Sequence, residues 1–238
     1  MYLKKDKFIQ SLLGVTSYLI LIDSKLNKND LAKKLTKSSF YTLKSRYAIP
    51  NTIKKKIEAD LICKHITFKK SYEKPSDSVD NCRLAKKSDY KQLKSISLEQ
   101  TSSSHFVQDK KLPIGFRKNF RFNWLSNFFK RKRGDYLIVY EKNKIEGFLL
   151  LIKKDKSFII DLIVTSKKKR KSGVARSLIN FVNNNYLKKN NSILIAGTQS
   201  NNFSAIKFYD KMNFKKINKQ YIYHIHKTNY LKNKNNKV

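Results

Sequence analysis

The last two thirds of the chain alternate between segments with strand-like and helix-like patterns of apolar residues. Continuous or alternating apolar runs predict strands, and apolar residues spaced three or four apart predict amphipathic helices. The predicted strands are residues 82–85, 136–141, 145–153, 158–165, 192–198 and 221–226, the second and third forming a hairpin around Asn143. The predicted helices are residues 88–98, 116–130, 174–187 and 202–212. Strands and helices therefore alternate over most of this part of the chain.

The first third of the chain is separated from the rest by a polar segment, residues 72–80, that contains Pro75 and breaks the pattern. Before it, residues 31–43 and 53–60 are predicted to be helical, and residues 64–68 alternate like a strand. We expect three regions: a small N-terminal α/β domain at 1–78, a larger domain at 79–227 and a polar tail at 228–238.

Residues 8–22 are largely apolar and follow several lysines, as in a signal peptide. The stretch lacks a small-x-small cleavage site, is interrupted by polar residues, and is shorter than the about 20 residues that span a bilayer. We expect a buried element here and no membrane span.

The chain has 238 residues, of which 53 are Lys or Arg and 17 are Asp or Glu, giving a net charge of +36. Such a charge favours a nucleic acid or an anionic membrane as partner. The lysines are spread along the chain among Asn and Ile, which is typical of a composition bias instead of a localised binding face. With 40% apolar residues the chain is not a disordered polybasic protein. We therefore expect no specific nucleic-acid partner.

Cys63 and Cys82 have neither metal-binding nor redox spacing. Two cysteines do not make a disulfide framework, so a reducing cytoplasm fits best.

A short loop between the apolar run 158–165 and the amphipathic run 174–187 is the most informative stretch of the chain. A strand, a tight loop and a helix in this order direct several backbone N–H groups and the positive end of the helix at one point. Such a point is an anion site, most often for phosphate. The residues that we expect to form it are Arg170, Lys171, Ser172, Gly173, Val174 and Ala175. The neighbouring run at 166–172 is also similar to a nuclear-import or RNA-binding patch, but its place beside the loop favours the phosphates of a cofactor.

The pattern R-x-x-G-x-A after a strand resembles the acyl-CoA loop of the GCN5-related N-acetyltransferases (GNAT superfamily). A second motif, from Asn202 to Phe214, resembles the late helix of that superfamily, N-x-x-A-x-x-x-Y-x-x-x-G-F, with Asn213 in place of the usual Gly. Asn is the next best residue for a left-handed helix end. The resemblance covers residues 81–227 and implies an α/β fold with a mixed, twisted sheet flanked by helices, and acetyl-CoA as co-substrate without a metal.

The resemblance also implies the residues that contact acetyl-CoA. Leu162, Ile163 and Val164 would pair with the pantetheine arm through their backbone, because this strand splays from the next one in the superfamily. Asn202 is similar to the motif Asn that contacts the cofactor near its β-alanine part, and Asn is also a favoured helix N-cap.

Two residues are candidates for catalysis by the same resemblance. Tyr209 occupies the position of the general acid, and a phenol with a reference pKa near ~10 suits a leaving thiolate. Asp161 is in the position of a base that acts directly or through water, and burial beside Ile160 would raise its pKa. The alternatives are a packing role for Tyr209 and a hydrogen-bonded strand role for Asp161.

Phe106, Asp109 and Pro113, with the small front domain, resemble more weakly the acetyltransferases of TDP-4-amino-4,6-dideoxygalactose (TDP-fucosamine). This favours a nucleotide-linked 4-amino sugar of surface polysaccharide synthesis as the acceptor. A protein N-terminus, another small amine, or a non-catalytic basic module that binds RNA or anionic surfaces are the alternatives. An exposed late strand could pair across a homodimer.

Three histidines complete the candidates. His224 and His226 fall on one face of a predicted strand, and without an evident third ligand we expect a strand surface and not a metal site. His105 lies in a segment that would border the acceptor site, where it could contact the substrate.

Overall fold

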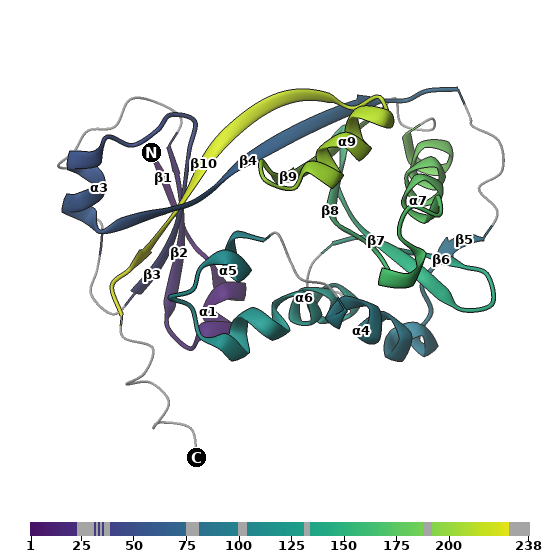
Figure 1. The fold of residues 1–238 in the computed structure, drawn as a ribbon, viewed down its shortest axis with the longest axis horizontal. Helices are drawn as coiled ribbons and strands as arrows, with labels where there is room; N and C mark the ends of the chain where they lie inside the picture. Colours follow the sequence, from purple (N-terminus) through teal and green to yellow (C-terminus); the bar gives the residue numbers. More distant parts are fainter. Residues whose placement is uncertain are drawn as a thin grey trace, which may run out of the picture.

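The computed structural model describes residues 1–22, 31, 33, 35, 39–74, 81–99, 104–130, 134–187 and 192–228. These residues form one ten-stranded mixed sheet flanked by helices (Figure 1). The strands are β1 (Tyr2–Lys5), β2 (Thr16–Ile22), β3 (Ser39–Ser45), β4 (Ala59–Ser71), β5 (Cys82–Leu84), β6 (Tyr136–Glu141), β7 (Ile145–Lys154), β8 (Ser157–Thr165), β9 (Ile193–Gln199) and β10 (Lys215–His226). The helices are α1 (Lys7–Leu13), α3 (Asn51–Ile57), α4 (Tyr90–Leu98), α5 (His105–Gln108), α6 (Ile114–Phe129), α7 (Val174–Val182) and α9 (Phe203–Lys211). The predicted mixed α/β fold is confirmed.

The strand order is β1-β2-β3-β10-β4-β9-β8-β7-β6-β5. Neighbouring strands are antiparallel except for the pairs β2–β3 and β8–β9, which are parallel. The long strands β4 and β10 run across the molecule and connect the part with β1, β2 and β3 to the part with β8 and α9 (Figure 1).

The N-terminal strands and the later strands thus belong to the same sheet. The predicted domain boundary at 78/79 lies outside the described residues, and so does the predicted tail apart from Thr228. No helix of the described residues is long and apolar enough to cross a membrane.

The core lies on both faces of β7, because successive side chains of a strand point to opposite faces of the sheet. Leu149 and Leu151 pack with α7 and β9, whereas Phe148 and Leu150 pack with α4 and α6. All four side chains are fully buried, and each burial contributes about 1.5–3 kcal/mol to stability. The helices are thereby held on opposite faces of the central sheet.

β8 and β9 separate after a short parallel ladder. Their pairing covers Ser157, Phe158 and Ile159 of β8, while β8 stays paired with β7 as far as Thr165. From Ile160 onward, the edge of β8 that faces β9 has no strand partner among the described residues, although β9 stays paired with β4 as far as Gln199. The splay that the superfamily resemblance implied is therefore present.

Two expectations about the sheet are wrong. Residues 39–43, predicted as the end of a helix, form most of β3, because they pair with β2 and β10 and their aromatic and β-branched side chains suit a sheet. The late strand was expected to be exposed, so that it could pair across a homodimer. It is instead an interior strand, since β10 is bonded to β3 on one edge and to β4 on the other.

Candidate active site

A cavity of about 430 Å³ opens where β8 and β9 separate. Its walls come from β3, β4, β8, β9, β10, α5, α6 and α9, with Ser104 and Asn202 at helix starts. The predicted site residues that line it are Asp161, Leu162, Ile163, Asn202 and Tyr209. The sequence motifs on β8 and α9, about forty residues apart, therefore meet at one place.

Tyr209 is buried on α9 with its ring held between aromatic neighbours. The ring centroids of Phe68 and Phe214 each lie 5.1 Å from that of Tyr209. Burial raises the pKa of the phenol above its ordinary value, so the group stays protonated at neutral pH. A protonated phenol that lines the cavity is able to donate a proton to a ligand there.

The α9 motif ends as expected. Asn213 has a φ of 60°, which is the left-handed conformation expected at this helix end. The amide of Phe214 then bonds the carbonyl of Tyr209 at 3.0 Å, which fixes the end of the helix that carries Tyr209.

Asp161 is the extra residue of a β-bulge. Leu150 pairs with Leu162 and Leu151 pairs with Ile160, so the register between β7 and β8 skips Asp161. A bulge redirects a side chain, and Asp161 lines the cavity together with both of its neighbours. The indole N–H of Trp124 donates a hydrogen bond of 2.6 Å to Asp161 Oδ2, which holds the carboxylate against α6.

The predicted phosphate loop lies outside the cavity wall, at the N-terminus of α7. Lys171 and Gly173 have φ values of 64° and 89°, and Gly173 is the N-cap of α7 without a side-chain cap. A β-carbon on Gly173 would meet nothing within 4 Å, so a ligand has room to approach. Arg170, Lys171, Ser172 and Gly173 are exposed, whereas Val174 is buried against the core and Ala175 is partly buried.

Asn202 and Val164 have structural contacts of their own. Asn202 Oδ1 accepts the amide of Ala205 as an N-cap, and its Nδ2 donates to Thr198 Oγ1 at 3.0 Å. The N-cap alternative for Asn202 is therefore present, and its side chain also lines the cavity. Val164 packs in the core beneath α4 and α6, so any ligand contact of Val164 is made by its backbone.

Four basic side chains line the cavity: Lys44, His65, His105 and Arg121. Burial and the charge of Arg170 lower the pKa of Arg121 to about 10, and burial and the charge of Lys44 lower the pKa of His65 to about 4. Among the described residues, no carboxylate lies within ion-pair distance of Arg121. A partly buried guanidinium without a carboxylate partner among the described residues favours an anionic ligand.

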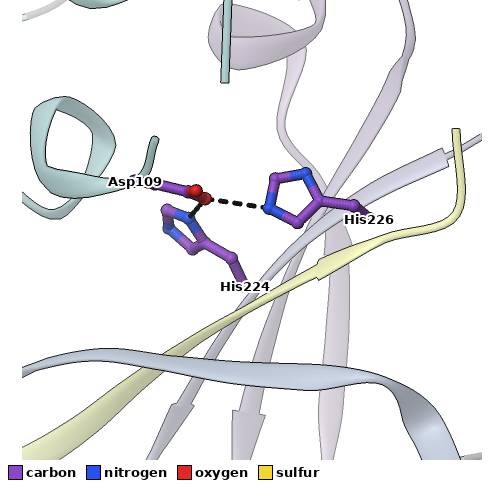
Figure 2. Close-up of side chains that lie close together, drawn as sticks. All are labelled: Asp109, His224 and His226. Atoms are coloured by element: carbon purple, nitrogen blue, oxygen red, sulfur yellow. Dashed lines mark hydrogen bonds and ion pairs between the residues drawn. The ribbon is translucent and has the colours of Figure 1, made fainter. Parts of the chain in front are cut away.

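His105, Asp109, His224 and His226 form a hydrogen-bonded cluster that sequence reasoning missed. Asp109 follows α5, and the two late histidines project from β10 toward it (Figure 2). Asp109 Oδ2 lies 2.5 Å from His224 Nδ1 and 2.8 Å from His226 Nε2. The expectation of a strand surface is wrong, because His224 is completely buried and His226 is mostly buried. The one signal in the sequence was the period-two spacing of the two histidines.

Asp109, His224 and His226 have ligand atoms within 4.8 Å of one another, as in a metal site. Zinc bonds of about 2.0–2.1 Å in tetrahedral geometry would hold ligand atoms about 3.3 Å apart. The 2.5 and 2.8 Å contacts to one oxygen are shorter and fit hydrogen bonds. The cluster as it stands is therefore a hydrogen-bond network.

Comparisons with known proteins agree with this geometry. Residues 132–216 match the family model of the acetyltransferase (GNAT) domain. This segment contains β6 to α9, and thus both sequence motifs and the splayed strands. No curated protein sequence matches the chain.

Solved structures resemble the chain in fold. A functionally unknown conserved protein from Staphylococcus epidermidis ATCC 12228 has a TM-score of 0.68 at 12% identity, with 93% of this chain and 90% of that chain covered. A GCN5-related N-acetyltransferase from Sphaerobacter thermophilus has a TM-score of 0.52 at 12% identity, covering 80% and 61%. A GNAT-family acetyltransferase from Colwellia psychrerythraea has a TM-score of 0.52 at 12% identity, covering 84% and 71%. Residues 132–216 thus match the GNAT acetyltransferase domain model, and the fold of the chain is similar to that of solved GNAT acetyltransferases.

Proposed function

We propose that the GNAT acetyltransferase domain of this chain transfers the acetyl group of acetyl-CoA directly to a primary amine. The observation that carries the proposal is the splay of β8 from β9, with Tyr209 on one wall of the cavity and the Gly173 loop beyond it. The free edge of β8 offers backbone groups for the pantetheine arm. The N-terminus of α7 offers N–H groups and positive charge for the pyrophosphate.

Within this proposal Arg170, Lys171 and Ser172 surround the phosphates, and Gly173 with Val174 and Ala175 keeps the start of α7 open to them. Leu162, Ile163 and Val164 bind the arm through the backbone, and Asn202 contacts the arm from the start of α9. The acetyl group then lies in the cavity near Tyr209.

Two side chains have chemical roles in the transfer. Tyr209 donates its phenolic proton to the departing thiolate. Such general acid catalysis typically raises the rate about 10²–10⁴-fold. An amine arrives as an ammonium ion and must lose a proton before it can attack. Asp161, redirected by its bulge and held by Trp124, accepts that proton directly or through water.

The acceptor that we favour is a nucleotide-linked 4-amino sugar. The basic side chains of Lys44 and Arg121 on the cavity wall support an anionic acceptor, and a diphosphate is the anion of such a sugar. The reaction fits the cytoplasm, where acetyl-CoA is available and the unpaired Cys63 and Cys82 stay reduced.

An acceptor screen with acetyl-CoA, read by release of free thiol, tests the proposal. The acceptors are TDP-4-amino sugars, UDP-amino sugars, polyamines and peptides with free N-termini. We expect thiol release with the nucleotide-linked amines, and little with Gly173→Glu as the matched control. Thiol release with peptides alone would move the acceptor to protein N-termini, and release with none would contradict the proposed function.

The net charge of +36 makes a nucleic-acid partner the alternative to test, and the salt dependence of binding tests it. Binding through phosphate contacts falls steeply with salt. We expect weak, sequence-independent binding of RNA and DNA at physiological salt. Nanomolar, sequence-selective binding at that salt would favour a nucleic-acid-binding module.

A further inference from the structure

Three side chains, His105, His224 and Asp109, form a hydrogen-bonded chain that reaches the cavity. His105 Nδ1 lies 2.8 Å from His224 Nε2, and His224 Nδ1 lies 2.5 Å from Asp109 Oδ2. His105 is the member that lines the cavity, and the other two lie behind it. We call these three residues the His105 relay. His226 stands beside it, bonded to the same oxygen of Asp109.

The proton positions in the relay follow from the ionised state of Asp109. Burial opposes this ionisation, but hydrogen bonds from His224 and His226 outweigh it and hold the pKa of Asp109 below its usual range. The Lys111 amide donates a further bond of 2.9 Å to Asp109 Oδ1. A carboxylate only accepts hydrogen bonds, so His224 must carry its proton on Nδ1.

The tautomer of His105 is fixed by the same logic. Burial lowers the pKa of His224, although the charge of Asp109 opposes this, and the ring is neutral at neutral pH. A neutral His224 with its proton on Nδ1 has a lone pair on Nε2. His105 must therefore donate from Nδ1, which leaves the lone pair of His105 on Nε2.

His105 Nε2 is on the side of the ring away from Nδ1. Among the described residues, it has no hydrogen-bond partner. His105 Nε2 is also not fully buried, because Gln10 Oε1 is the one fully buried side-chain oxygen or nitrogen in the described ranges that lacks a partner. His105 Nε2 is therefore accessible from the cavity that its ring lines.

The surroundings keep His105 in the uncharged form that can accept a proton. Its pKa is well below the ordinary value, first because of burial and then because a charge on His105 would be repelled by Lys44 and by any charge on His224 or His65, while Asp109 opposes the shift. These groups come from β10, β3, β4 and the loop after α5.

We propose that His105 Nε2 accepts the proton that the amine loses as its nitrogen attacks the thioester, and that His224 and Asp109 hold His105 in the tautomer that allows this. The inference rests on the proposed acetyl transfer and adds a second proton acceptor to it. Asp161 takes the proton of the ammonium ion before attack, and His105 takes the proton of the attacking nitrogen.

The step balances in atoms and charge. The C–N bond forms, the C–S bond breaks, and the thiolate takes the proton of Tyr209. The proton from nitrogen goes to His105 Nε2, and the proton on His105 Nδ1 moves to His224 Nε2. The positive charge thus comes to rest on His224, paired with the Asp109 carboxylate. Solvent then carries a proton from the relay back to Tyr209.

A nitrogen NMR spectrum of the imidazole rings tests the relay without any acetyl transfer. The protein has four histidines, and single His→Gln variants assign each ring. At pH 7.5 we expect His105 and His224 as Nδ1–H tautomers, with His105 Nε2 unprotonated. A His105 ring protonated at Nε2, alone or as an imidazolium ion, would contradict the proposal whether or not the chain is an acetyltransferase.

Kinetics of His105→Gly test the chemical role. We expect turnover to fall about 10²–10⁴-fold, acetyl-CoA affinity to stay within about twofold, and added imidazole to restore part of the rate. Tyr209→Phe is the matched control: it is also slow, but imidazole should not restore it. Wild-type turnover in a folded His105→Gly variant would overturn the inference, while inactive wild-type protein would count against the proposed function.

Metal analysis supplies the last test. The purified protein should lack stoichiometric zinc, and a chelator should leave the rate unchanged. Stoichiometric zinc whose removal abolishes activity would place an ion between Asp109 and His224 and overturn the relay.

Discussion

The imidazole ring of His65 lies directly over Gly197, in the space that a side chain at position 197 would occupy. A β-carbon there would be 2.5 Å from His65 Cε1 and 2.6 Å from His65 Nε2. The two residues are diagonal neighbours on the paired strands β4 and β9, since His65 pairs with Gln199 and Thr67 with Gly197. Because both residues line the cavity, the glycine determines where the imidazole sits.

Gly197→Ala should therefore destabilise the protein by about 1–3 kcal/mol, the usual cost of overpacking. Urea unfolding measures this free energy. In a His65→Ala background the same substitution should cost less than about 1 kcal/mol, because the ring is gone. Equal costs in both backgrounds would show that the ring does not determine the effect.

Gly173→Glu should abolish acetyl-CoA binding while the fold is kept. The new side chain brings bulk and negative charge to the N-terminus of α7, where the cofactor phosphates are proposed to bind. Calorimetric titration with acetyl-CoA measures the loss.

Gly173→Asn is the control for Gly173→Glu, because it brings the same backbone strain of a side chain at a φ of 89°, with Asn among the residues that adopt positive φ most often, and adds no charge. We expect the Asn variant to bind acetyl-CoA within about tenfold of wild type. Unchanged affinity in a folded Glu variant would remove the phosphate site from the α7 N-terminus.

Tyr209→Phe should lower turnover about 10²–10⁴-fold with nearly constant acetyl-CoA affinity. The ring and its contacts with Phe68 and Phe214 remain, so packing alone predicts little change. Because burial raises the pKa of the phenol, wild-type turnover should not decline through pH 9–10 from loss of this proton. A normal rate for the Phe variant, measured where chemistry limits turnover, would exclude Tyr209 as the acid.

His65 should make the protein less stable in mild acid. Its pKa is lowered from 6.5 to about 4 by burial and by Lys44, so the unfolded chain binds a proton between these values while the folded protein does not. The folded protein therefore keeps its full stability with respect to His65 above about pH 6.5, and loses part of it as the pH falls toward 4. Between pH 7 and 4.5, wild type should lose on the order of 1–3 kcal/mol more stability than His65→Gln. Parallel pH profiles of urea unfolding for the two proteins would contradict this.

Local patterns were sufficient for the elements that carry the proposed acetyl-CoA site. The apolar run before Arg170 and the amphipathic run after Gly173 predicted β8 and α7, and Asn213 was correctly expected in a left-handed helix end. Each of these depends on residues close together in the sequence, where strand and helix periodicity and capping act.

Features that depend on long-range pairing were out of reach. Residues 39–43 continue an apolar helical pattern, and only the ladders to β2 and β10 make them a strand. The contact between Asp109 and His224 joins residues 115 positions apart. The bulge at Asp161 arises from the register between β7 and β8, which the sequence of β8 alone does not contain.

The position of β10 between β3 and β4 has a consequence for how the protein folds during synthesis. β3 and β4 leave the ribosome well before residues 215–226 exist, and until then each has an edge without its partner. Unpaired strand edges are sites of aggregation and of wrong pairing. The nascent chain must therefore keep two strand edges unmatched until nearly the whole described sequence has been made, and a chaperone that covers such edges would act on this protein late in translation.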